Sequence, residues 1–236
     1  MSTALLALQV AIPTPGGAPL GIAGSPPASL DDRGVFVVSI AGRNIGTETF
    51  EIRSSRDQVV ADAEIQLRVE QDGKTYAFKT FPKLVLNSQL QPQTYSWSQK
   101  GAQSSSLEVD FRSSPVKTQY LTVAGEKDNR DFELLKDVAV IDNNVFHHFQ
   151  LIVDRYRMTK GGKQTFPAFV PQDAAPGQLT IEDAGMEQTQ IRGHKENLDH
   201  LVVTTELAQI DLWVDDQQHL QRVSIPAAKL EAIRKP

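Results

Sequence analysis

Two adjacent histidines, His147 and His148, are the residues whose type could most directly carry chemistry. Imidazole titrates near neutral pH, so either ring could act as a general base or as a proton-sensitive latch. Adjacent side chains on a helix point about 100° apart, so the two rings cannot chelate one metal ion together. The alternative is a hydrogen-bonded histidine where a helix meets a sheet, and we favour it because buried polar groups are normally hydrogen-bonded.

Other polar clusters have the residue types of metal ligands without the right spacing. His194 and His200 have carboxylates between them, but a glycine and an asparagine within residues 193–200 predict a solvated loop. Residues 215–216 predict a hairpin tip and residues 142–144 a helix cap. Residues 72–74 lack the further ligands of a calcium loop. We therefore expect no bound metal.

Motifs of the common catalytic sites are absent from the sequence. It holds no Gly-x-Ser-x-Gly elbow, no phosphate loop, no dinucleotide fingerprint and no His-Glu-x-x-His helix. Gly161-Gly162-Lys163 follows a predicted helix and precedes a predicted strand, whereas a phosphate cradle has the opposite order. The chain has no cysteine, so thiolate nucleophiles and disulfides are excluded. We expect a protein that is not an enzyme and needs no cofactor.

The amino-acid composition of the chain argues against nucleic acid as a partner and against a membrane-spanning segment. The chain has 236 residues, of which 40% are apolar and 22% charged, so it can bury a core. Its net charge of −5 argues against a nucleic-acid binder, which normally carries a basic patch. No apolar run approaches the ~20 residues of a membrane-spanning helix, so we expect no transmembrane segment.

The N-terminal residues differ in composition from the rest of the chain. Residues 4–12 have the length of a signal-peptide core but lack preceding basic residues, so they predict either an export signal or a floppy end. Residues 13–34 are rich in Pro, Gly, Ala and Ser, as linkers are. We predict a flexible segment over 1–34, a possible remnant of a signal peptide, and one antiparallel β domain over 35–236.

Hydrophobic alternation predicts strands along most of the domain. Ile65, Leu67 and Val69 alternate with polar residues, as in a strand with one buried face. Short strands joined by hairpin signals predict an antiparallel meander. The predicted strands cover about residues 35–40, 45–53, 64–70, 76–78, 84–86, 95–97, 107–111, 120–123, 165–170, 179–182, 186–191, 201–206, 210–214 and 220–225. The tail, 227–234, fits a helix or a strand.

One segment changes period. Val145, Phe149, Ile152 and Tyr156 recur at helical spacing, which predicts a helix over about 143–159. Asparagines precede it, basic residues occupy its last turns, and a glycine pair follows it. Its apolar face needs a surface to pack on. The predicted fold is therefore mainly β (α+β), a curved antiparallel sheet or incomplete β-barrel wrapped around one principal helix.

Six short segments carry a resemblance to a known group of proteins. They are Ile45–Glu48, Val140–Phe149, Gly161–Gln164, Phe169–Gln172, Leu212–Asp216 and Val223–Pro226. Together they resemble an uncharacterised family of exported bacterial proteins, a domain of unknown function. That family is similar in pattern to the periplasmic lipoprotein-carrier half-barrel group. The resemblance implies a periplasmic or exported location and a concave apolar surface; the cytoplasm is the alternative location.

The remaining functional signal is a set of large apolar and aromatic residues. A half-barrel with an under-filled interior would hold a lipid or another hydrophobe, whereas a filled interior would be an ordinary core. The candidate ligand-binding residues are Phe78, Leu86, Trp97, Phe111, Phe146, His148, Phe149, Tyr156 and Trp213.

These observations leave three functional hypotheses. The first is a non-enzymatic cell-envelope protein that binds a hydrophobic ligand, such as a lipid or lipoprotein, or an envelope partner. The second is a structural or interaction module without a small-molecule ligand. The third is an enzyme with an unrecognised site near His147 and His148.

Overall fold

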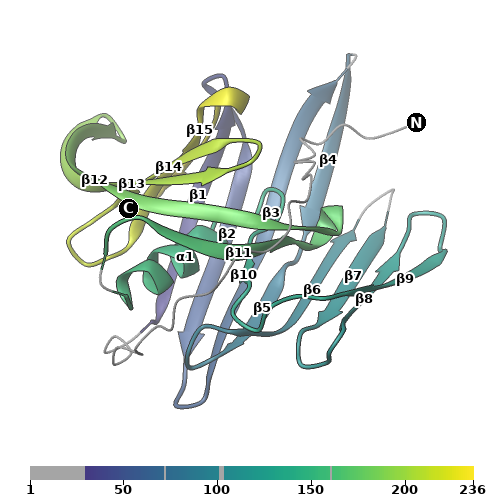
Figure 1. Ribbon diagram of the computed structural model, residues 1–236. Helices are drawn as coiled ribbons and strands as arrows, with labels where there is room; N and C mark the ends of the chain where they lie inside the picture. The colour runs from purple at the N-terminus through teal and green to yellow at the C-terminus, as the bar shows by residue number, and fades with distance from the viewer. Residues whose placement is uncertain (1–29, 72, 101–103, 160) are drawn as a thin grey trace.

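The computed structural model describes residues 30–71, 73–100, 104–159 and 161–236. The predicted export signal, and most of the predicted linker, lie outside these residues. Within them, sixteen strands form one sheet that curves around a single α-helix (Figure 1). The prediction of a curved, mainly antiparallel sheet around one helix is confirmed. No helix in this part of the chain is long and apolar enough to cross a membrane.

The first half of the chain is an antiparallel meander. Consecutive strands pair from β1 to β4 and from β6 to β9, and β4 pairs with β6. Strand β5 lies off this path and pairs with β3 and β6. The strands are β1 (Asp32–Ile40), β2 (Arg43–Ser54), β3 (Gln58–Gln71), β4 (Lys74–Thr80), β5 (Lys83–Asn87), β6 (Pro92–Lys100), β7 (Ser105–Asp110), β8 (Val116–Leu121) and β9 (Lys127–Phe132).

The second half adds the helix and the other end of the sheet. Its strands pair in sequence order, and β16 pairs with β1, which joins the two halves. The elements are β10 (Ala139–Val140), α1 (His148–Arg157), β11 (Gln164–Val170), η1 (Pro171–Asp173), β12 (Ala175–Ile191), β13 (His194–Thr205), β14 (Gln209–Val214), β15 (Leu220–Ile225), η2 (Pro226–Ala228) and β16 (Leu230–Arg234).

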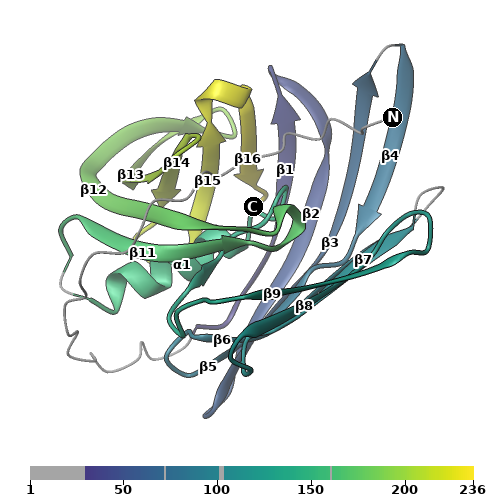
Figure 2. The same cartoon turned by 45° about the vertical axis from the view of Figure 1, so that its right-hand side comes forward.

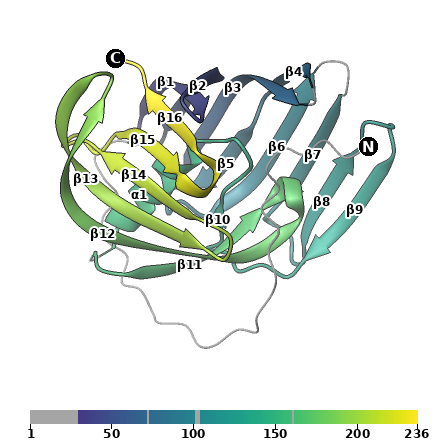
Figure 3. The same cartoon turned by 90° about the horizontal axis from the view of Figure 1, so that it is seen from above.

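The curved sheet encloses α1 on its concave side. Seen from above, β1–β4 run along the upper edge of the view and β11 and β12 along its lower edge, with α1 between them (Figure 3). A side view shows the hairpin of β3 and β4 projecting beyond the neighbouring strands (Figure 2). The two end regions of the sheet approach each other, because Phe132 of β9 lies 5.0 Å from Phe169 of β11 between ring centroids. The barrel is therefore incomplete but tightly curled.

Side-chain alternation explains which face is buried. In β3, Ile65 and Leu67 are buried in the main core, while Gln66 between them and Arg68 after them are exposed. Adjacent residues in a strand point to opposite faces, so the apolar set turns inward toward α1. The predicted alternation of this strand is confirmed.

The helix is shorter than predicted, beginning at His148 rather than near residue 143 and ending at Arg157. Residues 142–144 do not cap it, because the N-cap is His147, which makes no side-chain capping hydrogen bond. Asn144 has a positive φ of 61°, which is incompatible with a helical turn. The segment ahead of α1 is thus an irregular, buried connection, and its backbone needs partners from elsewhere in the fold.

The predicted loop over 193–200 is also wrong. These residues begin β13, which pairs with β12 from the turn at Arg192 and Gly193 onward. Arg192 and Gly193 both have positive φ, as a tight hairpin turn requires. The polar residues here occupy the far end of a long, curled hairpin, where a strand can carry polar side chains on both faces. The tail of the chain is strand β16.

Candidate functional site

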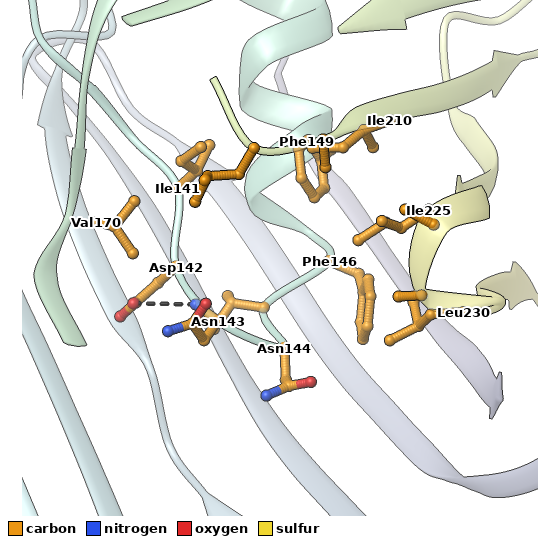
Figure 4. A pocket seen from close by; sticks show the side chains of 15 residues that line it. Ile141, Asp142, Asn143, Asn144, Phe146, Phe149, Val170, Ile210, Ile225 and Leu230 are labelled. Carbon is orange, nitrogen blue, oxygen red and sulfur yellow. Dashed lines mark hydrogen bonds between the residues drawn. The ribbon is translucent and has the colours of Figure 1, made fainter. Parts of the chain in front are cut away.

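An apolar pocket, called here the helix pocket, lies between the connection ahead of α1 and the C-terminal strands. Its volume is about 300 Å³. Phe146, Ile225 and Leu230 face one another across it, and Phe149 lies beside Ile210 (Figure 4). The lining residues are Ile141, Asp142, Asn143, Asn144, Val145, Phe146, Phe149, Val170, Leu207, Ala208, Ile210, Ile225, Ala227, Ala228 and Leu230.

Two similar corners of the sheet supply walls of the helix pocket. Val170 and Ile225 each end a strand, and each is followed by a proline that begins a single 3₁₀ turn. Each turn closes with a residue of positive φ, at Ala174 and Lys229. Proline fixes φ near −65° at the start of such a turn, so both corners bend sharply and leave their β-branched residue at the pocket.

Asp142 forms a polar part of the lining, but its carboxylate is already engaged. One oxygen accepts the backbone N–H of Asn143 at 3.0 Å and of Gln172 at 3.1 Å. The other accepts the hydroxyl of Tyr95 at 2.6 Å. Burial raises the pKa of Asp142 to about 7, although these hydrogen bonds oppose the rise. Asp142 therefore holds the connection in place rather than offering a free carboxylate to a ligand.

Asn144 is the polar lining residue with unused hydrogen-bonding capacity. The amide of its neighbour Asn143 donates to Asp173 at 3.0 Å, whereas the side chain of Asn144 makes no hydrogen bond to any residue that the structure describes. An amide offers two donor hydrogens and an acceptor oxygen. The pocket thus combines apolar walls with a few polar side chains, of which the Asn144 amide is available to a ligand, as is usual in sites for small molecules.

A buried carboxylate, Glu48 of β2, holds the connection from the other side. Its oxygens accept the backbone N–H of Phe146 and of His147, each at 2.7 Å, and the His147 Nδ1 atom lies at 2.8 Å. Glu48 and His147 have no solvent-exposed surface. The carboxylate therefore serves donors just ahead of α1, where a helix leaves backbone N–H groups unpaired and favours a negative charge.

His148 adds an unpaired imidazole to this buried layer. Its ring lies 4.8 Å from that of His147 and 5.6 Å from that of Tyr95, between centroids. Neither of its ring nitrogens has a hydrogen-bond partner among the described residues. Burial, and then the proximity of His147, hold the pKa of His148 well below its ordinary value. His148 is therefore a neutral core side chain at physiological pH.

The two histidines lie beneath the helix pocket rather than in it. Neither belongs to its lining, and both side chains are fully buried. The hydrogen-bonded arrangement expected for a histidine between helix and sheet is found at His147 but not at His148. Tyr95, Asp142, Glu48 and the two histidines together form a polar layer that fixes the pocket wall from below.

The structure divides the nine candidate ligand-binding residues among several places. Phe146 and Phe149 line the helix pocket. Phe78 lines a second cavity at the base of the β3–β4 hairpin. The others are not among the residues of the helix pocket. Leu86, Phe111, His148 and Tyr156 are buried, Trp97 is partly buried against the core, and Trp213 packs with Ile191 and Leu198.

Trp213 belongs to a separate cluster on the opposite face of β14 from Leu212. Its ring stacks on His200 at 4.9 Å, and the guanidinium of Arg222 lies 4.4 Å from its centroid. His200 also contacts Glu187 and Asp211, each at 3.1 Å. No group of three or more His, Cys, Asp or Glu residues among those described is arranged to hold a metal ion.

Sequence reasoning missed Glu48, which the structure places at the centre of the polar layer. A signal was present: Glu48 is two residues before the inward-facing Phe50, so strand alternation puts its carboxylate inside. Ala208, Ala227 and Ala228 have small side chains that leave room for the helix pocket, and no pattern in the sequence identifies them as lining residues. They come together only through the pairing of distant strands.

The fold and the site define an incomplete antiparallel barrel with a helix and an apolar pocket in its concave side. Among solved structures, the chain is similar to a DUF1089 family protein from Pseudomonas aeruginosa, at 13% identity and a TM-score of 0.43, over 77% of this chain and 90% of that chain. DUF1089 is an uncharacterised domain family. No protein-family model and no curated protein matches the chain. The resemblance to exported proteins and lipoprotein carriers gains no support from these comparisons and stays a prediction.

Proposed function

We propose that the protein binds a small apolar molecule, or the apolar end of a longer one, in the helix pocket, without catalysing a reaction. The observation that carries this proposal is the lining itself, which is dominated by Phe146, Phe149, Ile210, Ile225 and Leu230. Burying apolar surface of a ligand against such walls is favourable by roughly 25 cal/mol per Å².

The size of the helix pocket limits the ligand. Its volume of about 300 Å³ matches the lower end of the range for small-molecule sites, ~300–1,000 Å³. Leu207, an exposed leucine, belongs to the lining and therefore lies where an apolar chain would leave the pocket. A ligand with one apolar end and an uncharged polar group near Asn144 would satisfy the site.

A fluorescence titration with N-phenyl-1-naphthylamine, an uncharged apolar dye, tests the proposal. We expect saturable binding that is lost in Ala208→Trp, because the indole would fill the pocket. Ala124→Trp makes the same change at an exposed turn and should bind as the natural chain does. Equal dye binding by both variants, at equal thermal stability, would remove the helix pocket as the site. In a separate experiment, native mass spectrometry of freshly purified protein would show the mass of any ligand that co-purifies with it.

The interaction-module hypothesis has weaker support. An edge strand that recruits a partner needs an accessible, largely uncharged edge, and charged residues on an edge discourage pairing. The terminal strand β9 reads Lys-Asp-Asn-Arg-Asp-Phe, so its composition protects the edge. The enzyme hypothesis depends on His147 and His148, which are fully buried and line neither cavity. These observations favour the ligand-binding proposal.

The proposal includes a location in the cell envelope. It is supported by the apolar composition of residues 4–12 and by the resemblance described above. Fusion of the whole chain to alkaline phosphatase, which is active only after export, tests it. Activity that depends on residues 4–12 is the expected result, and an inactive fusion that accumulates in the cytoplasm would refute it.

A further inference from the structure

A second cavity, called here the basic hollow, lies at the base of the projecting β3–β4 hairpin. Its volume is about 420 Å³. Three of its lining residues, Arg68, Lys79 and Lys100, are cationic and none is acidic. The complete lining is Asn44, Ile45, Gly46, Thr47, Gln66, Leu67, Arg68, Ala77, Phe78, Lys79 and Lys100.

Strand register brings the cationic side chains together. Lys79 of β4 pairs directly with Lys100 of β6 and, on its other side, with Gln66 of β3. Directly paired residues point to the same face, so the two lysines share a face with Gln66 and with Arg68 two residues further on. Both ammonium groups also approach one ring, that of Phe81, at 5.4 and 4.7 Å from its centroid.

The direct pairing of Lys79 with Lys100 is unfavourable unless a negative charge lies nearby. Like charges directly opposite each other in a sheet are destabilising. Glu64 compensates Lys79 at 2.9 Å, and its pKa is lowered chiefly by this contact and the hydrogen bond from Gln66. Among the described residues, no carboxylate forms an ion pair with Arg68 or Lys100. Three positive charges against one negative charge leave a local excess of two, in a chain whose net charge is −5.

The backbone also shapes this cavity. Gly46 has a φ of +152°, and a Cβ atom there would lie 1.9 Å from the carbonyl oxygen of Gln66. Only glycine permits so close an approach of β2 to β3. Leu67 and Phe78, which pair directly with each other, line the cavity from the opposite face of the sheet, because each is next in sequence to a cation.

We propose that the basic hollow binds a phosphate group carried on an aromatic body. A guanidinium donates paired hydrogen bonds that match phosphate oxygens, and the two ammonium groups add point charges. The Phe81 ring, which both ammonium groups approach, offers an aromatic surface beside the cations and favours a phosphate with an aromatic substituent over the bare ion. The site is separate from the helix pocket and shares no lining residue with it.

Isothermal titration calorimetry with phenyl phosphate tests the proposal. We expect one saturable site, and an affinity reduced by about tenfold or more in the double variant Arg68→Gln/Lys100→Gln, because hydrogen bonds between charged groups are lost. The control Lys117→Gln/Lys127→Gln removes the same charge from exposed positions of β8 and β9 and should bind normally. Unchanged dye binding in the helix pocket verifies that each variant is folded.

A second arm identifies the source of the phosphate. Co-sedimentation with phosphatidylglycerol vesicles, but not with phosphatidylcholine vesicles, would indicate a lipid headgroup if Arg68→Gln/Lys100→Gln abolishes it. Binding of phenyl phosphate without co-sedimentation would indicate a soluble phosphomonoester. Absence of both kinds of binding, or an equal loss in the control variant, would overturn the proposal.

Discussion

Replacement of Glu48 by alanine should destabilise the protein more than any comparable change on the same strand. The carboxylate accepts the backbone N–H of Phe146 and of His147 and contacts the His147 ring, and all of these groups are buried. In Glu48→Ala, these donors lose their acceptor in a place where water does not reach. The connection ahead of α1, which is one wall of the helix pocket, would then lose its anchor.

The expected magnitude follows from the hydrogen bonds lost. Each buried donor left without a partner costs about 1–3 kcal/mol. Removal of one member of a buried polar pair typically costs about 3–5 kcal/mol. We therefore expect a loss near 4 kcal/mol in the free energy of unfolding, or more than ~1 M in the urea midpoint for an m-value of about 3 kcal/mol/M. Glu48→Gln should lose roughly half as much, since its amide retains one acceptor oxygen.

Urea unfolding followed by tryptophan fluorescence measures these differences. Glu51→Ala is the matched control, because Glu51 lies in the same strand but is exposed and pairs with the exposed Arg53. Its loss should stay within about 0.5 kcal/mol. A Glu48→Ala variant that is no less stable than Glu51→Ala would refute the idea that this carboxylate anchors the connection. Dye affinity for the helix pocket should fall in Glu48→Ala even under conditions where it is folded.

Three further predictions concern pH and backbone geometry. Because burial raises the pKa of Asp142 to about 7, the native state retains a proton that the unfolded chain releases. The free energy of unfolding should therefore decrease as the pH rises from about 4 to about 7. In urea titrations at several pH values, Asp142→Asn should make this dependence on pH less steep. Tyr95→Phe removes a hydrogen bond that lowers this pKa, so the slope should extend to higher pH. Gly46→Ala should lower the free energy of unfolding by more than ~2 kcal/mol. Gly185→Ala should lower it by about 1 kcal/mol, because Gly185 also has a positive φ but a Cβ atom there would meet no neighbouring atom.

Features that depend on neighbouring residues were predictable from the sequence. Alternation at Ile65, Leu67 and Val69 identifies a strand, because a side-chain period of two requires no knowledge of the partner strand. Helical spacing around Phe149 and Ile152 identifies α1 for the same reason. The basic residues expected in its last turns are Arg155 and Arg157, which lie near the C-terminal end and interact favourably with the helix dipole.

Features that depend on distant pairing were not predictable. The polar layer joins Glu48 of β2 to residues 98 and 99 positions away, and Asp142 to Tyr95 at a separation of 47. The asparagines before α1 are good capping residues by type, yet a carboxylate from another strand takes over that role. Local propensity therefore placed the helix start too early, since tertiary hydrogen bonds decide where an irregular segment ends.

The position of the polar layer also explains why an apolar pocket can persist in this fold. Residues 141–147 are irregular. The N–H groups of Ile141 and Val145 bind backbone carbonyl groups, whereas those of Asn143, Phe146 and His147 need side-chain acceptors, and leaving them unpaired in a buried segment would be costly. Glu48 and Asp142 satisfy them from two sides, which fixes Phe146 in the pocket wall without filling the pocket. A purely apolar layer would leave those N–H groups without acceptors. Glu48, Asp142 and His147 thus spend their hydrogen-bonding capacity on supporting the wall of the helix pocket.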